Sequence, residues 1–188
     1  MDTPYRPQIT HASRPLTFTV DARNERGEVL ATEIAGEHPL TLYVDKREIV
    51  TLMTLGSAPE ALAIGYLRNQ RLVGSIEEIV AVQVDWEVNS VVVTTRNGLA
   101  DLDGRMEKRT VTTGCGQGTV FGEVMDEIES IRLPDDVFIT EAAFYSLMDS
   151  VRRHDTVYKQ AGAVHGCALA THSHAGAGIL MFVEDVGR

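Results

Sequence analysis

The sequence predicts a mixed fold of the α/β or α+β class, and two observations carry this prediction. In the first half of the chain, short runs rich in β-branched residues alternate with turn residues, as in antiparallel strands. In the second half, apolar residues recur every three or four positions, as in amphipathic helices, before two more β-rich runs. A chain of 188 residues is long enough to bury a core of its own.

The chain divides into a leader and one folded unit. Prolines at positions 4, 7 and 15 and few large apolar side chains predict a flexible leader over residues 1–15. The folded unit covers residues 16–188, and its first part is expected to be an antiparallel β meander. The runs of this meander are 17–21, 29–34, 40–44 and 48–53.

The elements after the meander follow from local signals. Pro59 stands in the first turn of a segment with apolar residues at helical spacing up to about Arg71, which predicts a helix. Residues 80–87 and 90–96 predict a β-hairpin. The later elements are a β-like run at 108–112, helices over 120–131 and 140–151, and strands over 164–171 and 179–183.

Composition excludes several classes of function. The chain has 27 acidic and 17 basic residues, a net charge of -10, so general binding to nucleic acid or anionic membranes has no electrostatic basis. Its two cysteines lie far apart, which suits a reducing compartment better than a secreted disulfide framework. No segment approaches the roughly 20 apolar residues that cross a bilayer, and residues 1–15 contain no signal-peptide core. We expect a cytoplasmic protein.

The strongest candidate for chemistry is Cys115, which lies in the segment 112–119 among the glycines Gly114, Gly116 and Gly118. The loop follows a predicted strand and precedes a predicted helix, so its N–H groups would favour an anionic thiolate. The thiolate is the form of cysteine that attacks sulfur donors. A tight turn with an incidental small cysteine is about equally supported by composition alone.

His165 and Cys167 alternate with Leu169 on a predicted strand, so the three side chains face the same way. The imidazole and the thiol suit a nucleophile pair or two metal ligands. For Cys167 we favour a buried structural role, because cysteine is among the most buried residue types and the strand is apolar. The role of His165 stays open.

Three weaker features remain. His172 and His174 flank one residue of a predicted turn, where they either bind a divalent metal or are solvated. The run 184–188, Glu-Asp-Val-Gly-Arg, follows a predicted strand, where the sites of α/β proteins gather. Basic residues precede the cysteine loop and end a predicted helix, and they offer charge for a phosphate-bearing ligand or form a solvated face. These are Arg105, Lys108, Arg109, Arg152 and Arg153.

Together these segments resemble the FdhD-like family of formate dehydrogenase accessory sulfurtransferases, from about Glu37 onward. The first block of the resemblance spans 37–67 and opens with Glu-His-Pro-Leu. The second is the cysteine loop at 112–118. The third pairs Ala-Val-His-Gly at 163–166 with the closing motif at 184–188. The order and spacing of the blocks make the combined match specific.

The resemblance implies a cytidine-deaminase-like core and a sulfur relay. A cysteine desulfurase would pass a persulfide to Cys115, which would pass sulfur to the molybdenum bis-guanylyl-molybdopterin cofactor before that cofactor enters formate dehydrogenase. The implied partners are the desulfurase, formate dehydrogenase and molybdopterin guanine dinucleotide; a homodimer is left open, and no resident metal is expected. The implied cofactor contacts are Gly116, Gly118, His165 and Arg188.

Two departures from the family pattern affect these expectations. Many members carry a Cys-x-x-Cys pair in the loop, whereas position 118 here is glycine, so the relay would use one thiol. The family also continues past the closing motif into a helix and further cofactor-contacting residues. We therefore expect this chain to lack the family's C-terminal segment, to fold, and to bind the cofactor weakly.

Two rival functions are kept beside the relay. A non-catalytic chaperone that presents cofactor to formate dehydrogenase would need no reactive thiol. A zinc nucleobase deaminase would need His/Cys-x-Glu followed by Pro-Cys-x-x-Cys. Residues 165–167 read His-Gly-Cys and the chain has no Cys-x-x-Cys, which disfavours the deaminase.

Overall fold

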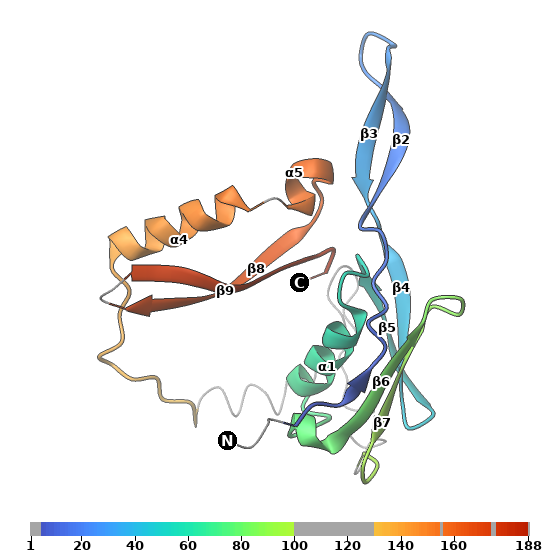
Figure 1. Cartoon of the computed structure of the whole chain (residues 1–188), viewed down its shortest axis with the longest axis vertical. Helices are drawn as coiled ribbons and strands as arrows, with labels where there is room; N and C mark the ends of the chain where they lie inside the picture. The colour runs from blue at the N-terminus through green and yellow to red at the C-terminus, as the bar shows by residue number, and fades with distance from the viewer. Residues whose placement is uncertain (1–4, 100–129, 155, 174–175, 188) are drawn as a thin grey trace.

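The computed structural model describes residues 5–99, 130–154, 156–173 and 176–187, and it confirms the predicted mixture of strands and helices. Figure 1 shows two groups of elements: an N-terminal group around helix α1, and a C-terminal group in which α4 and α5 accompany a long hairpin. In chain order the elements are β1 (Gln8–Ile9), β2 (Thr17–Arg23), β3 (Val29–Ala35), β4 (His38–Val44), β5 (Arg47–Thr54), α1 (Pro59–Asn69), the short 3-10 helix η1 (Ile76–Glu78), β6 (Ile79–Asp85), β7 (Ser90–Thr95), α4 (Glu141–Arg153), α5 (Val157–Ala161), β8 (His165–Ser173) and β9 (Gly176–Asp185).

A five-stranded sheet with the order β1-β6-β7-β4-β5 organises the N-terminal group. Two antiparallel hairpins, β4–β5 and β6–β7, form most of it, and both were expected from the sequence. The hairpins join where β4 runs parallel to β7, and β1 adds in parallel to the outer edge of β6.

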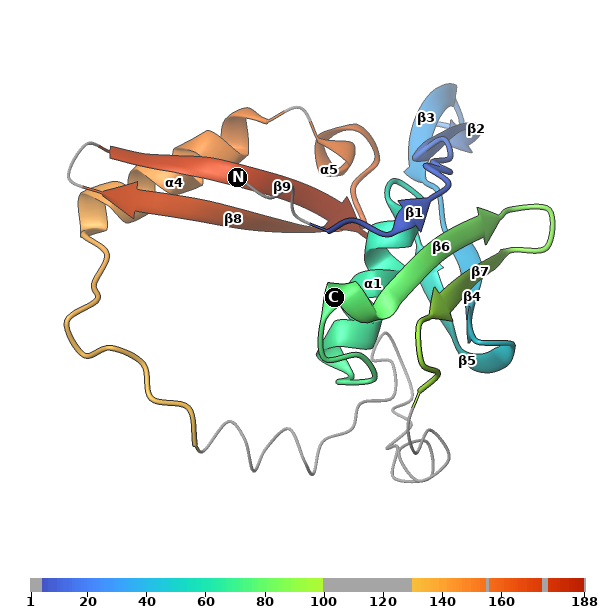
Figure 2. The same cartoon turned by 60° about the horizontal axis from the view of Figure 1, so that its bottom comes forward.

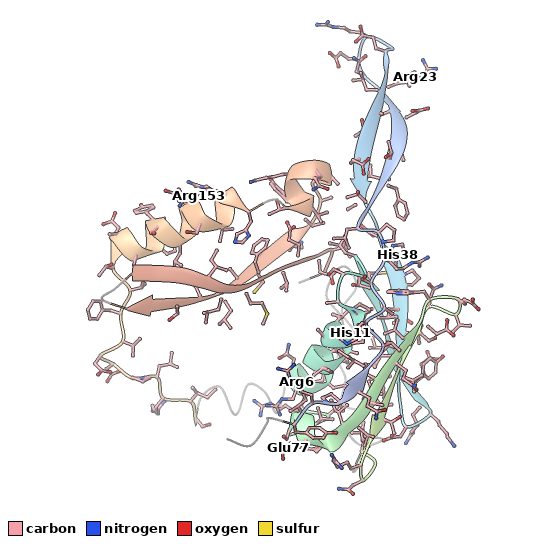
Figure 3. The ribbon with its side chains drawn as sticks, in the orientation of Figure 1. Arg6, His11, Arg23, His38, Glu77 and Arg153 are labelled. Atoms are coloured by element: carbon pink, nitrogen blue, oxygen red, sulfur yellow. The ribbon has the colours of Figure 1, made fainter. Side chains whose placement is uncertain are left out.

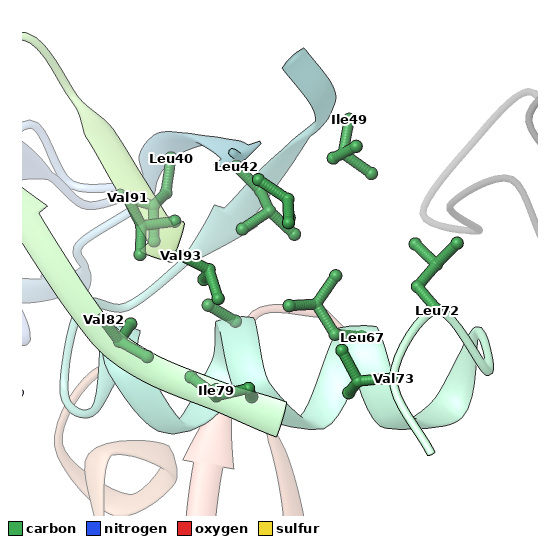
Figure 4. Packing of buried hydrophobic residues seen from close by; sticks show 12 residues of the cluster. Leu40, Leu42, Ile49, Leu67, Leu72, Val73, Ile79, Val82, Val91 and Val93 are labelled. Atoms are coloured by element: carbon green, nitrogen blue, oxygen red, sulfur yellow. The ribbon is translucent and has the colours of Figure 1, made fainter. Parts of the chain in front are cut away.

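The main hydrophobic core lies between this sheet and α1, as Figure 4 shows. Leu40 and Leu42 on β4 and Val91 and Val93 on β7 are fully buried, and their neighbours along each strand are more exposed. Leu67 meets them from α1 and is also fully buried. The alternation along β4 and β7 therefore reflects a sheet with one face covered by a helix.

The predicted meander is divided between two sheets. Strands β2 and β3 pair antiparallel in a sheet of their own, which projects from the rest of the chain in Figure 1. The Gly36 amide continues this pairing by donating to the Leu16 carbonyl at 2.7 Å, so the chain leaves the hairpin before β4 begins. Local alternation predicts the strands correctly, but it does not specify which strand each one pairs with.

Residues 5–15 of the predicted leader lie against the five-stranded sheet and α1, where hydrogen bonds hold them. Strand β1 pairs with β6, and the Trp86 indole donates to the Ala12 carbonyl at 2.6 Å. The Thr10 hydroxyl and the Ala12 amide each donate to the Glu60 carboxylate at 2.7 Å. The prolines and the few large apolar side chains of this segment argue against a strand buried in the core. They do not argue against a segment that hydrogen bonds hold on the surface.

In the C-terminal group, α4 lies along one face of the β8–β9 hairpin, as Figure 2 shows. The helix begins after Thr140, whose hydroxyl accepts from the Ala143 amide at 3.2 Å, in agreement with the sequence. Helix α5 has five residues, too few for a periodic pattern to predict it. The predicted run 108–112 and nearly all of the predicted helix 120–131 lie outside the described residues. Among the described helices, none has the length and apolar character that crossing a bilayer requires.

Candidate functional site

One of the five predicted site residues can be placed. His165 begins β8, and its Cα partner on β9 is Asp185. Partners on antiparallel strands project their side chains to the same face, so His165 lies beside the closing motif. Cys115, Gly116, Gly118 and Arg188 lie outside the described residues.

The Asp185 carboxylate ties the end of β9 to the turn that follows β5. Its Oδ2 accepts from the Thr54 hydroxyl at 2.9 Å, and its Oδ1 accepts from the Leu55 amide at 2.8 Å and the Val186 amide at 2.7 Å. Thr54 is 1% exposed and Leu55 is fully buried, so water has little access to the two donors. Hydrogen bonds to a carboxylate are stronger than those between neutral groups. Asp185 therefore holds the end of β9 firmly against the β5 turn.

The neighbouring Glu184 fixes a different element, because successive side chains on a strand point to opposite faces. Its Oε2 accepts from the Val157 amide at 2.7 Å, and its Oε1 from the Tyr158 amide at 3.2 Å. These amides open α5 and have no partner within the helix. The two acids of the closing motif therefore hold the β5 turn and the start of α5.

The same hydrogen-bond chain reaches the N-terminal segment. The Gly56 amide donates to the Thr54 hydroxyl at 3.0 Å, and the Gly56 carbonyl accepts from the Arg14 amide at 2.9 Å. Gly56 has φ of 79°, and an added Cβ would lie 3.3 Å from both Arg14 Cβ and the Trp86 ring. A side chain at this position would therefore strain the turn and press on its neighbours.

His38 is a buried polar residue that sequence reasoning did not single out for chemistry. It lies where the N-terminal segment crosses the start of β4, as Figure 3 shows, and it is 8% exposed. Its ring centroid is 5.7 Å from that of Phe18 and 5.9 Å from that of Trp86. Burial and the Arg14 guanidinium lower the pKa of His38, and a hydrogen bond with the Pro15 backbone opposes them. The net lowering of the pKa favours the neutral ring. Its alternation with Leu40 and Leu42 along β4 is the signal in the sequence that His38 is buried.

The prediction that Cys167 is buried is wrong, although it does lie on a strand. The face of the hairpin that carries Phe182 is covered, and the Phe182 ring stacks on His154 with centroids 5.0 Å apart. Cys167 projects from the opposite face and is exposed, as is Leu169 at 57%. An apolar run predicts a strand, but not whether its second face is covered.

The described side chains of this region hold secondary-structure elements in place, and they form no evident catalytic group. Within the described ranges, no three His, Cys, Asp or Glu side chains form a group that could hold a metal ion. Glu184 and Asp185 accept hydrogen bonds from backbone amides, so both carboxylates are engaged in holding elements together. These carboxylates lie at the end of the β8–β9 hairpin where β8 begins with His165 and β9 runs into the closing motif.

A solved structure shares this arrangement of elements. It comes from Desulfotalea psychrophila, and its name assigns the protein, provisionally, as a formate dehydrogenase accessory protein. The TM-score is 0.67 over 92% of this chain and 64% of that chain, with 19% sequence identity. This match defines the class: an α+β protein with the fold of that accessory protein.

Sequence comparison gives the family. Residues 35–188 match the FdhD/NarQ family, and the chain belongs to it, which confirms the resemblance drawn from the motifs. Two relatives are each named Sulfur carrier protein FdhD. The one from Shouchella clausii is 28% identical over 159 residues, which cover 82% of this chain and 58% of that protein. The one from Wolinella succinogenes is 24% identical over 183 residues, covering 96% and 62%. The chain thus spans less than two thirds of the length of these relatives.

Proposed function

We propose that this chain is a sulfur carrier that takes sulfur from a cysteine desulfurase and delivers it to the molybdenum bis-guanylyl-molybdopterin cofactor of formate dehydrogenase. Membership of the FdhD/NarQ family carries the proposal, because the matched residues 35–188 include the glycine-flanked Cys115. Relatives matched over most of this chain bear the name of a sulfur carrier protein. The proposed location is the cytoplasm, where a thiol relay stays reduced.

The loading step is a thiol–persulfide exchange on Cys115. The Cys115 thiolate attacks the terminal sulfur of the desulfurase persulfide, a new S–S bond forms, and the old S–S bond breaks. The desulfurase cysteine leaves as a thiolate, and Cys115 becomes the persulfide. The step conserves atoms, electrons and charge, so one thiol is sufficient and glycine at position 118 is no obstacle.

Delivery to the cofactor requires two electrons. The terminal sulfur of the persulfide is formally neutral, and a thiol reductant converts it to sulfide while Cys115 leaves as a thiolate. The proposed contacts to the cofactor are His165, Arg188 and the N–H groups of Gly116 and Gly118, which are hydrogen-bond donors suited to phosphate and guanine oxygens. Formate dehydrogenase then receives the cofactor. Self-association as a homodimer stays a prediction that sedimentation would test.

The experiment is to incubate the chain with a cysteine desulfurase and cysteine, and to map the tryptic peptides by mass spectrometry. We expect one added sulfur atom on the Cys115 peptide, removed by a thiol reductant. An unmodified Cys115 in the folded chain would favour the alternative, a chaperone that presents cofactor without carrying sulfur. Addition confined to Cys167 would contradict the assignment of the carrier residue.

A further inference from the structure

We propose that Asp185 is a positioning residue, which fixes the cofactor-binding edge formed by His165 and the closing motif to the five-stranded sheet. The inference rests on the proposed function for the identity of the ligand. Asp185 itself makes no contact with the ligand in this proposal. It acts by holding its neighbours.

The three hydrogen bonds of the Asp185 carboxylate come from two parts of the chain distant in sequence. Thr54 and Leu55 precede α1, whereas Val186 follows β9. Both Asp185 oxygens are used, one toward a side chain and one toward two amides. A carboxylate accepts at both oxygens, whereas an amide side chain accepts at one and donates at the other. Aspartate therefore accepts from all three donors, whereas asparagine would place an NH2 group against the Thr54 hydroxyl, which would lose the acceptor for its own proton.

The geometry connects this joint directly to the predicted ligand contacts. Asp185 is the Cα partner of His165, so the two Cβ atoms are expected about 4.5–5.5 Å apart on one face of the hairpin. Asp185 is also three positions before Arg188. If the Asp185 carboxylate releases Thr54, the end of β9 loses a hydrogen-bonded support, and His165, the partner of Asp185 on β8, moves relative to the sheet.

Glu184 provides a matched control. It is the adjacent residue, it is also an acid, and it also accepts from two backbone amides. Its bonds go to Val157 and Tyr158 on α5 rather than to the β5 turn. Substitution by the corresponding amide removes one negative charge and one acceptor in each case. A general effect of charge or stability would appear in both variants, whereas positioning through Thr54 would appear only at position 185.

The test compares the wild type with Asp185→Asn, Thr54→Val, the double variant and Glu184→Gln, using GDP as the probe in an NMR titration that measures weak affinities. We expect Asp185→Asn and Thr54→Val each to weaken GDP binding roughly tenfold, the scale of one hydrogen bond to a charged group. The double variant should bind no more weakly than Thr54→Val alone, because both single variants remove the bond between Thr54 and Asp185 and Thr54→Val in addition removes the acceptor of the Gly56 amide. Glu184→Gln should change the affinity less than about twofold. Equal losses in Asp185→Asn and Glu184→Gln, or none in Asp185→Asn, would overturn the proposal.

A second readout does not depend on the ligand. The imidazole proton shifts of His165 should change in Asp185→Asn and Thr54→Val and stay as in the wild type in Glu184→Gln. Unchanged His165 shifts in the first two variants would overturn the inference even if no form of the chain bound GDP. Failure of the wild type to bind GDP, with persulfide still formed on Cys115, would instead contradict the proposed cofactor delivery. The two failures are therefore distinguishable.

Discussion

In the five-stranded sheet, α1 covers the face that carries Leu40, Leu42 and Val93, and all three side chains are fully buried. In the β8–β9 hairpin, α4 covers one face only, and on the other Leu169 and Met181 are 57% and 58% exposed. The strands of both regions are rich in apolar residues. The difference is that the side chains under α1 are fully buried, whereas no residue of α4 is buried and the second face of the hairpin carries large exposed apolar side chains. Burial rather than strand pattern therefore decides where stability resides.

The link between the two regions is small and combines hydrogen bonds with apolar contacts. A small apolar cluster of Leu55, Val157 and Val164 is buried beside the Asp185 hydrogen bonds. Such a link transfers position from the well-packed sheet to the exposed hairpin. The comparison thus assigns most of the stability to the N-terminal region. It assigns the predicted ligand contact His165, at the end of the hairpin that Asp185 holds, to the C-terminal region.

Leu42→Ala should produce the largest change. Leu42 is fully buried in the core, so its truncation leaves a cavity and should lower the free energy of unfolding by roughly 2–5 kcal/mol. Urea denaturation followed by circular dichroism would measure the loss. The matched control is Leu169→Ala, the same substitution at an exposed position, with an expected change within about 0.5 kcal/mol. Similar losses in the two variants would break the distinction between the regions.

Glu60→Gln should have an intermediate effect, because it weakens the hold on the N-terminal segment. Burial raises the pKa of Glu60, but hydrogen bonds from Thr10 and from the Ala12 amide outweigh it, so the folded-state pKa is below its ordinary value. The ionised carboxylate therefore stabilises the fold above the unfolded-state pKa of about 4.3, and this contribution is lost as pH falls through the folded-state value. We expect a loss of about 1–2 kcal/mol near pH 7.

Unfolding in urea at several pH values would measure this contribution. The difference between wild type and Glu60→Gln should shrink as the pH falls below about 4.3. A difference that stays constant down to acid pH would show that the Glu60 charge does not hold the segment.

Cys167→Ala should have the smallest effect. The side chain is exposed on β8, so removing its sulfur leaves no cavity, and the free energy of unfolding should change by no more than about 0.5 kcal/mol. Differential scanning calorimetry with Cys167→Ser as a companion variant would measure it. A loss above about 1 kcal/mol in both variants would restore the structural role expected from the sequence.

Local patterns in the sequence predict the strands of the β4–β5 and β6–β7 hairpins and the helices α1 and α4. Alternation and end signals are encoded within a few residues. They do not predict the separation of β2–β3 from β4–β5, because pairing partners depend on contacts made elsewhere. Local patterns also do not predict the docking of residues 5–15, because it depends on a buried carboxylate, Glu60, about 50 positions away. The motif 184–188 can be noticed, yet the distinct tasks of Glu184 and Asp185 depend on which donors the fold brings to them.

The most direct measurement of the central claim compares the two cysteines. Cys115→Ala and Cys167→Ala are incubated with a cysteine desulfurase and cysteine labelled with radioactive sulfur, and the protein-bound label is counted before and after thiol reduction. Sulfur carriage by Cys115 predicts that reducible label is lost in Cys115→Ala and stays at the wild-type level in Cys167→Ala. Reducible label at the wild-type level in Cys115→Ala would contradict the account.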